Sequence, residues 1–210
     1  MPTRFIDLTH PLLDGGPSWP GDPGISVAPH CTLERDGCRV SRVSMGSHQG
    51  THLDAPSHFL PEGCDIDGMT LEPFFGPARL LRIPKGRGEA LDLPDLLPFE
   101  ALIRPGARIL YHTGWGENWG REGFFTEGPC LTLDAARFLA SRRIALLGMD
   151  TSTPAADNAQ AVHEVLLGAG VVIVEGLANL GLCPDSFTLS AFPLALADAD
   201  GSPIRAVAIC

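Results

Sequence analysis

The chain has 210 residues, of which 44% are hydrophobic and 19% charged, so it can bury a core and is neither a disordered tail nor a coiled coil. We expect one domain spanning residues 1–210. The net charge of −10 argues against nucleic acid and anionic membrane surfaces as partners. The longest apolar runs have the length of buried strands, so the sequence predicts no membrane span.

The elements expected along the chain are mostly short, because 19 prolines and 24 glycines interrupt it. Thr132 is expected to cap a helix, and Gly168 to end a later one. In chain order we expect strand Arg39–Met45, strand Arg79–Ile83, a short helix around Leu96–Leu102, strand Arg108–His112, a helix from Thr132 to Arg143, strand Ile144–Met149, helix Asn158–Leu167, and strands Val171–Glu175, Thr188–Phe192 and Ile204–Ile209. The order predicts a β-rich, mixed α/β or α+β domain with helices packed on a sheet.

The cysteines show no C-x-x-C pair, and the N-terminal segment has no apolar region typical of export. We therefore expect reduced thiols and a cytoplasmic protein. The cysteines are Cys31, Cys38, Cys64, Cys130, Cys183 and Cys210.

The segment from residue 48 to 58 concentrates metal-binding side chains: His48, His52, Asp54 and His58. Gly50 and Pro56 argue against a continuous helix, whereas in an extended chain all four side chains share one face because their positions share parity. Full extension would separate His48 from His52 by ~13 Å, too far for one ion. We therefore expect a bend at Gly50, where a positive φ is allowed.

Other interpretations of the same residues are weaker. A Ser/His/Asp triad using Ser47 or Ser57 is disfavoured, because the chain has no G-x-S-x-G segment. Gly168-x-Gly170 closes a helix and opens a strand, which is the reverse of a dinucleotide-binding turn. His163 and Glu175 lie on a helix and at a strand end that can meet, and without the first segment neither would be assigned a function.

The pattern His48-x-Gly50-Thr51-His52-x-Asp54-Ala55-Pro56-x-His58-Phe59 resembles the signature of the bacterial kynurenine formamidase and cyclase-like metal-dependent hydrolase family. The resemblance continues through Phe5–Leu8, Trp19–Asp22, Gly148–Thr151 and Gly201–Val207. It implies a swivelling β/β/α-type fold with a mixed sheet or barrel-like core. It also implies a homodimer and one or two divalent ions, with zinc preferred and manganese as the alternative.

The resemblance also implies roles. His48, His52 and Asp54 would hold the first ion, and Asp54, His163 and Glu175 the second. His58 would be the general acid/base and Trp19 a substrate contact. The implied reaction belongs to tryptophan catabolism, in which water activated by the metal hydrolyses N-formylkynurenine to kynurenine and formate.

The sequence also departs from the formamidase branch. Ser152–Asn158 lacks its serine-lysine pair, and Glu164 follows His163 where that branch often has a second histidine. Thr113-Gly114-Trp115 resembles a broader branch that includes hydrolases of isatin and of cyclic esters. Opening of a cyclic amide or ester is therefore an alternative reaction. A non-catalytic protein that binds a metal or small ligand is an alternative of another class.

Overall fold

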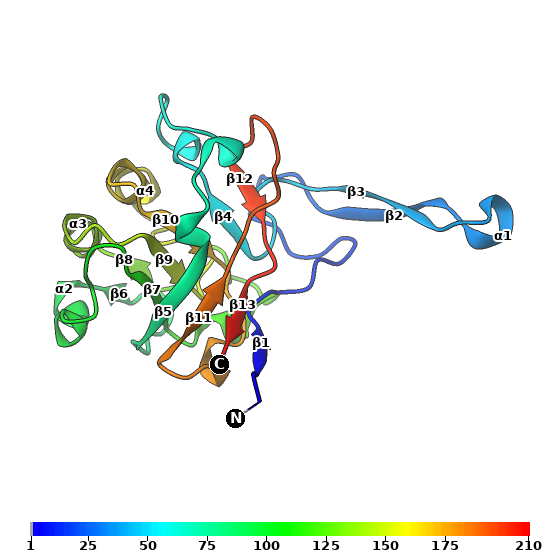
Figure 1. Ribbon diagram of the computed structural model, residues 1–210. Helices are drawn as coiled ribbons and strands as arrows, with labels where there is room; N and C mark the ends of the chain where they lie inside the picture. The colour runs from blue at the N-terminus through cyan, green and yellow to red at the C-terminus, as the bar shows by residue number, and fades with distance from the viewer. Residues whose placement is uncertain (1) are drawn as a thin grey trace.

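The computed structural model describes residues 2–210, and over these its largest element is a curled sheet of nine strands (Figure 1). The central strands run parallel to one another, and the strands at both ends are antiparallel to their neighbours. In spatial order the strands are β1 (Phe5–Asp7), β13 (Val207–Ile209), β11 (Ser186–Ser190), β5 (Phe75–Arg82), β7 (Arg108–His112), β9 (Leu146–Met149), β10 (Val172–Glu175), β4 (His52–Asp54) and β12 (Gly201–Pro203).

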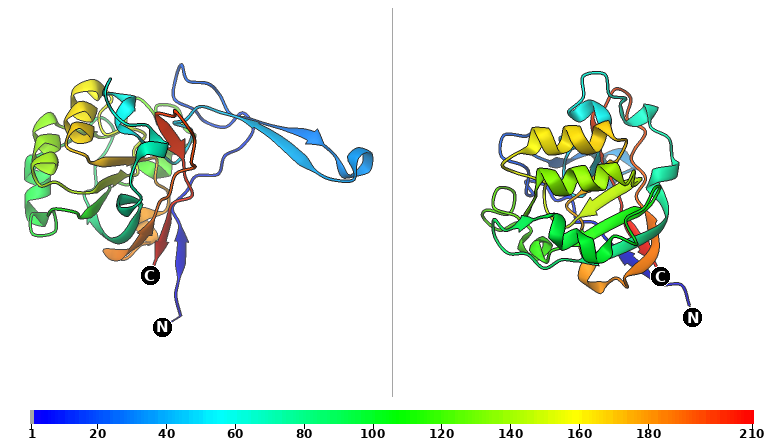
Figure 2. Two further views of the ribbon diagram at one scale, coloured as in Figure 1. Left: turned by 45° about the horizontal axis from the view of Figure 1, so that its top comes forward. Right: turned by 90° about the vertical axis from the view of Figure 1, so that its left-hand side faces the viewer.

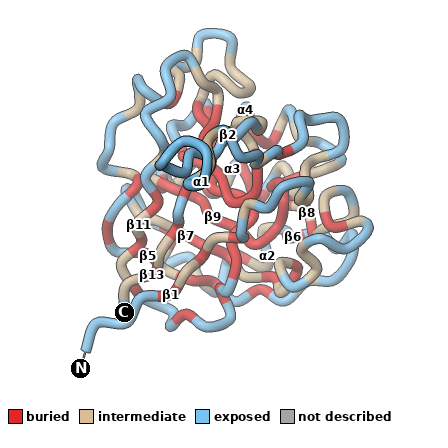
Figure 3. Tube along the Cα trace, turned by 90° about the vertical axis from the view of Figure 1, so that its right-hand side faces the viewer, coloured by how far each residue is buried: buried red, intermediate tan, exposed pale blue. Residues whose placement is uncertain are grey.

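The parallel centre of the sheet is buried on both faces. Strands β9 (Figure 3) and β10 are buried at every position, which explains why they appear in the sequence as continuous apolar runs. One face packs beneath the helices α2 (Leu93–Leu96), α3 (Leu133–Ser141) and α4 (Ala159–Gly168) (Figure 2). The opposite face is covered by side chains of the antiparallel strands, including Leu53 and Leu189.

A hairpin of β2 (Ser26–Cys31) and β3 (Val40–Ser44) projects from this body, with the short helix α1 (Leu33–Asp36) at its tip (Figure 1). Every residue of β3 is exposed. Two further short strands, β6 (Ala90–Leu91) and β8 (Cys130–Leu131), pair in parallel. The 3-10 helices are η1 (Pro56–His58), η2 (Ile66–Gly68), η3 (Glu72–Phe74), η4 (Leu97–Phe99), η5 (Trp115–Asn118) and η6 (Leu180–Leu182).

The predicted mixed α/β class, with helices packed on a sheet, is confirmed. Helix α3 begins as expected, because Thr132 Oγ1 accepts a hydrogen bond from the Ala135 amide at 3.3 Å. The helix expected around Leu96–Leu102 is wrong in extent. Helix α2 ends at Leu96 and η4 follows, because Pro98 has no amide hydrogen to continue the α-helical ladder.

The strand expected over Ile204–Ile209 is also wrong in extent. Strand β12 precedes it and β13 covers only its last three residues, because Ile204 leaves the sheet edge and makes an isolated bridge to Pro193. The strand expected over Thr188–Phe192 begins earlier, at Ser186, and ends at Ser190.

All six cysteines, which lie within residues 2–210, are free. None of the helices found in that range combines the length and the apolar character that a bilayer crossing needs.

The burial of His10 makes the free energy of unfolding depend on pH. Its ring stacks on Trp119 with centroids 4.1 Å apart, and burial lowers its pKa to about 4. In the unfolded chain the imidazole has a pKa of about 6.5, so it binds a proton at a higher pH than in the folded protein. The stability that the neutral His10 ring contributes is therefore present above pH 6.5 and is lost as pH falls toward 4. We expect the free energy of unfolding to fall between pH 7 and pH 5 by about 1–2 kcal/mol more in the wild type than in His10→Phe, measured by urea unfolding. Equal pH dependence in the two proteins would contradict this.

Candidate metal centre

Strand β4 carries two of the predicted ligands into the interior of the protein. It lies between β10 and β12 and is antiparallel to both, so that His52 is opposite Glu175 on one side and Pro203 on the other. His52 and Asp54 alternate on the strand and therefore share a face. Asp54 is only 1% exposed and His52 5%. A charged carboxylate buried this deeply needs a compensating partner.

A bend at Gly50 brings His48 to the same place. Gly50 has φ +69°, and a Cβ atom there would lie 2.6 Å from Leu12 Cδ2. His48 Nδ1 consequently lies 3.0 Å from Asp54 Oδ1. The expectation that parity along one extended segment aligns all four side chains is wrong, because only His52–Asp54 is a strand. His48 lies on a turn, and His58 ends helix η1.

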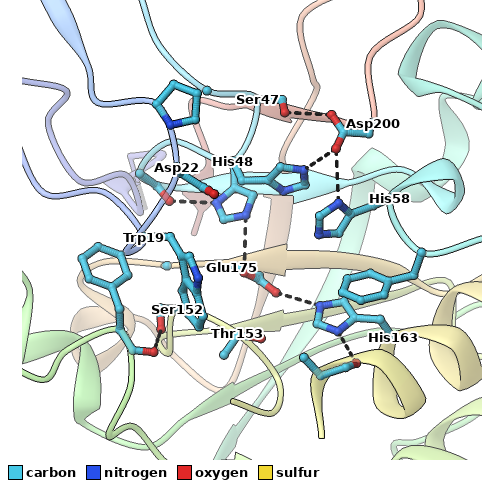
Figure 4. A pocket seen from close by; sticks show the side chains of 18 of the residues that line it. Trp19, Asp22, Ser47, His48, His58, Ser152, Thr153, His163, Glu175 and Asp200 are labelled. Carbon is cyan, nitrogen blue, oxygen red and sulfur yellow. Dashed lines mark hydrogen bonds and ion pairs between the residues drawn. The ribbon is translucent and has the colours of Figure 1, made fainter. Parts of the chain in front are cut away.

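His163 and Glu175 approach from the other half of the chain. Glu175 is the last residue of β10, and His163 lies in the middle of α4 rather than near its end. His163 Nε2 is 3.4 Å from Glu175 Oε1 (Figure 4). The same atom is 3.6 Å from Asp54 Oδ2. His52 Nε2 is 3.3 Å from Glu175 Oε2. The structure therefore brings all five predicted ligands together.

The hydrogen bonds behind these imidazoles indicate that the cluster fits a cation. His52 Nδ1 donates to the Gly50 carbonyl at 2.9 Å, and His163 Nδ1 donates to the Ala159 carbonyl at 2.7 Å. In the neutral rings, this leaves an Nε2 lone pair facing carboxylate oxygens, which is favourable only with a positive charge between them. Four side-chain polar atoms among residues 2–210 are buried without a hydrogen-bond partner, and two of them, His52 Nε2 and Asp54 Oδ2, belong to this cluster.

The ligand atoms form two groups that share Asp54. His48, His52 and Asp54 make one group and Asp54, His163 and Glu175 the other, each with its ligand atoms within 4.8 Å of one another. Imidazole and carboxylate donors suit zinc and manganese. A third group of the same kind joins His48 and His58 to Asp200 and is more exposed.

Protons compete with a cation for this cluster. Burial opposes protonation of His48, but hydrogen bonds to Asp200 and Asp54 outweigh it and raise the pKa of His48 to about 10. Burial likewise opposes ionisation of Asp54, but the hydrogen bond from His48 and its positive charge hold the pKa of that carboxyl below its usual range. Binding of a metal at His48 therefore displaces a proton.

His58 lies beside the ligand cluster without belonging to either of the two groups that share Asp54. Its ring centroid is 3.9 Å from that of His48, and its Nδ1 is 3.2 Å from Asp200 Oδ2. Burial lowers the pKa of His58, so the imidazole is neutral at pH 7 and can accept a proton.

A cavity of about 610 Å³ opens over these residues. Trp19, Phe59, Trp119 and Phe125 contribute aromatic faces to its wall. The rings of Trp19 and Phe125 meet edge to face with centroids 6.1 Å apart. The structure thus places Trp19 in the same cavity as His58 and the ligand cluster, within reach of a common small molecule.

Asp200 is the residue that the sequence analysis missed. It directly precedes β12 and lies between His48 and His58 (Figure 4). In the sequence, Asp200 is marked only by its position next to Gly201–Val207, a segment that resembles the family and contains no predicted site residue. The contact with His48 spans 152 positions of sequence, so no local pattern indicates it.

Gly201 leaves room for the His48 ring. A Cβ atom at this position would lie 2.6 Å from His48 Cε1 and 2.9 Å from His48 Nε2. We expect Gly201→Ala to displace the imidazole and weaken zinc binding on the order of 10-fold, as for other residues that support a ligand. Gly168→Ala is the control, because a Cβ atom there meets nothing within 4 Å. Competitive zinc titration measures the zinc affinity of both variants. Equal affinities would show that zinc binding by His48 does not depend on the space at Gly201.

Buried imidazole and carboxylate donors at the wall of an aromatic cavity, carried on this α/β fold, define a metal-dependent hydrolase. The family model described as "Putative cyclase" matches residues 6–156. The kynurenine formamidase of Bacillus thuringiensis (strain Al Hakam) is 33% identical over 209 residues, covering 98% of this chain and 97% of that protein. The chain belongs to this cyclase family.

Solved structures agree with the fold. Isatin hydrolase A from Labrenzia aggregata superimposes with a TM-score of 0.86 at 28% identity, covering 99% of this chain and 93% of that one. A potential metal-dependent hydrolase with cyclase activity has a TM-score of 0.84 at 27% identity, covering 99% and 98%. The fold and the enzyme class are thus common to relatives with different substrates.

Proposed function

We propose that the protein is an arylformamidase-like amidohydrolase that cleaves the C–N bond of N-formylkynurenine and releases kynurenine and formate. The observation that carries the proposal is the placement of His58 beside the buried ligand cluster at the floor of an aromatic cavity. The identity of 33% to a kynurenine formamidase over almost the entire chain supports this substrate.

The proposed roles follow from the contacts of each residue. His48, His52 and Asp54 would hold a first divalent ion, and Asp54, His163 and Glu175 a second. A divalent ion held there supplies Lewis acidity to a carbonyl and lowers the pKa of water. His58 Nδ1 is engaged by Asp200, so Nε2 is the nitrogen that accepts a proton from the attacking water. The same nitrogen returns the proton to the amine as the C–N bond breaks.

The aromatic wall would select the substrate. Trp19 presents a flat apolar face, and its edge-to-face contact with Phe125 restricts its motion. An anilide ring stacked on Trp19 would leave its formyl group directed toward His58. Stacking of this kind contributes about 0.5–1.5 kcal/mol beyond the burial of apolar area.

A cyclic amide or ester is the second candidate substrate. The likeness to isatin hydrolase A, at 28% identity, favours it. Ser152 and Thr153 line the cavity in the segment where the sequence departs from the formamidase branch. A ring-opening reaction uses the same residues and differs in that the leaving group, an amine from an amide or a hydroxyl from an ester, remains attached to the product.

A substrate panel separates the two candidates. Purified protein loaded with zinc or manganese is assayed with N-formylkynurenine, isatin and an aromatic lactone at matched metal content. We expect the highest kcat/KM with N-formylkynurenine and loss of turnover after chelation, with recovery on adding the metal back. Higher kcat/KM with isatin or the lactone would replace the proposed substrate, and activity that survives chelation would overturn the role of the metal.

We also propose zinc as the native ion, with manganese as the alternative and one or two ions per chain. The 210 residues would act as one domain, in a cytoplasmic homodimer that serves tryptophan catabolism. Elemental analysis of protein purified without added metal tests the first of these, and light scattering tests the dimer. The formal charge of −10 supports the expectation that neither nucleic acid nor membrane is a partner.

A further inference from the structure

Asp200 makes three side-chain contacts, and all of them involve the edge of the metal centre. Its Oδ2 atom is 3.1 Å from His48 Nε2 and 3.2 Å from His58 Nδ1. Its Oδ1 atom accepts a hydrogen bond from Ser47 Oγ at 2.8 Å. One carboxylate oxygen thus serves two imidazoles, while the other is fixed by a hydroxyl (Figure 4).

The contact with His48 determines which of its nitrogens is free to bind a metal. His48 Nδ1 is the atom that lies 3.0 Å from Asp54 Oδ1, within the group that fits an ion. A lone pair on Nδ1 requires the hydrogen to be on Nε2, and Asp200 accepts that hydrogen. A carboxylate behind the distal nitrogen of a metal-binding histidine fixes its tautomer and its orientation.

The contact with His58 determines the opposite tautomer there. Asp200 faces His58 Nδ1, so the hydrogen resides on Nδ1 and the lone pair on Nε2. His58 lines the cavity, and Nε2 is then the nitrogen that can take a proton from a bound reactant. A carboxylate that orients a general base in this way holds it in the productive tautomer.

We propose that Asp200 is a positioning residue that sets the tautomer of both His48 and His58 through its single oxygen Oδ2. The role of His58 in turnover and the metal at His48 Nδ1 rest on the function proposed above, whereas the contacts of Oδ2 with both rings follow from the geometry. Because the two imidazoles share one acceptor, a change at Asp200 alters metal binding and proton transfer together.

Asp200→Asn tests the proposal, because asparagine has the shape of aspartate without its charge or its second acceptor oxygen. Asp198→Asn is the matched control. Asp198 is exposed and has φ +54°, a conformation that asparagine tolerates. Long-range ¹H–¹⁵N spectra of the zinc-loaded proteins report the tautomer of each histidine without any substrate. We expect the Nδ1–H form of His58 in the wild type and in Asp198→Asn, and a shift toward the Nε2–H form in Asp200→Asn.

Kinetic and binding measurements complete the test. We expect Asp200→Asn to lower kcat about 10- to 100-fold with KM changed less than about twofold, and to weaken zinc binding about 10-fold. Ser47→Ala retains the carboxylate but frees Oδ1, so its loss of kcat is expected to be smaller and in the same direction. The tautomers of the zinc-loaded wild type keep the test open if Asp200→Asn does not fold.

The outcomes separate the positioning role from the proposed function. Unchanged tautomers and zinc affinity in a folded Asp200→Asn would overturn the role of Asp200. If Asp200→Asn cannot be purified folded, an Nε2–H form of His58 in the zinc-loaded wild type would overturn it. A wild type that is inactive on N-formylkynurenine but shows the tautomer shift on substitution would overturn the substrate and leave the role of Asp200 supported.

Discussion

Replacing His58 with alanine is expected to lower kcat by about 10²- to 10⁴-fold, the usual contribution of a general acid/base, while the metal content stays unchanged. The reason is the separation of roles within the site. His58 Nδ1 is engaged by Asp200, and His58 lies outside both groups that contain Asp54. Removal of its ring therefore removes proton transfer and leaves the buried ligands in place. Turnover of N-formylkynurenine and elemental analysis of the same preparation measure the two effects.

His30→Ala provides the matched control for this variant. His30 is exposed on β2, at a distance along the hairpin from the cavity, and its loss should change neither quantity. Loss of the metal in His58→Ala would show that His58 is a metal ligand. It would identify the group of His48, His58 and Asp200 as an occupied metal site.

Replacing Asp54 with alanine is expected to remove both the metal and the activity. Asp54 is the one residue shared by the group with His48 and His52 and the group with His163 and Glu175. We expect zinc affinity to fall more than ~100-fold, beyond the 10- to 100-fold loss typical of residues that only support a ligand. Isothermal titration measures the affinity. Thermal unfolding gives a second measure, because an ion at 100 times its Kd stabilises a binding-competent protein by about 2.7 kcal/mol.

Asp67→Ala is the control for this second variant, since Asp67 is an exposed aspartate on η2. Its affinity and its metal-induced stabilisation should equal those of the wild type. Retention of tight zinc binding by Asp54→Ala would show that the ion is held elsewhere and would refute the assignment of both groups.

How far the sequence predicts this site depends on the range of the contacts. His48, His52, Asp54 and His58 fall within eleven consecutive positions, and the bend at Gly50 follows from a distance argument on that segment alone. His163 and Glu175 could be assigned only through the resemblance to a family. Their approach to β4 depends on that strand inserting between β10 and β12, a pairing that no local pattern encodes.

The prediction of the fold likewise succeeded where the pattern is local and failed where the contacts are long-range. The buried parallel strands and the two longer helices were recognisable because four to ten residues give a clear pattern. Strands β1, β4 and β12 have only three residues each, too few to show alternation. The β2–β3 hairpin was half predicted, because β3 was expected as a strand and its partner was not. Its exposure gives it no apolar face that the sequence could reveal.

The position of β4 between β10 and β12 has a consequence for how the protein is made. The strand with His52 and Asp54 leaves the ribosome before both strands that flank it, which lie beyond residue 170 together with Asp200. Its two hydrogen-bonded neighbours are thus synthesised more than one hundred residues later. Such long-range closure is slow and comes late in folding. A nascent chain that carries the complete histidine motif therefore has no assembled metal centre until the segment through Pro203 has been translated.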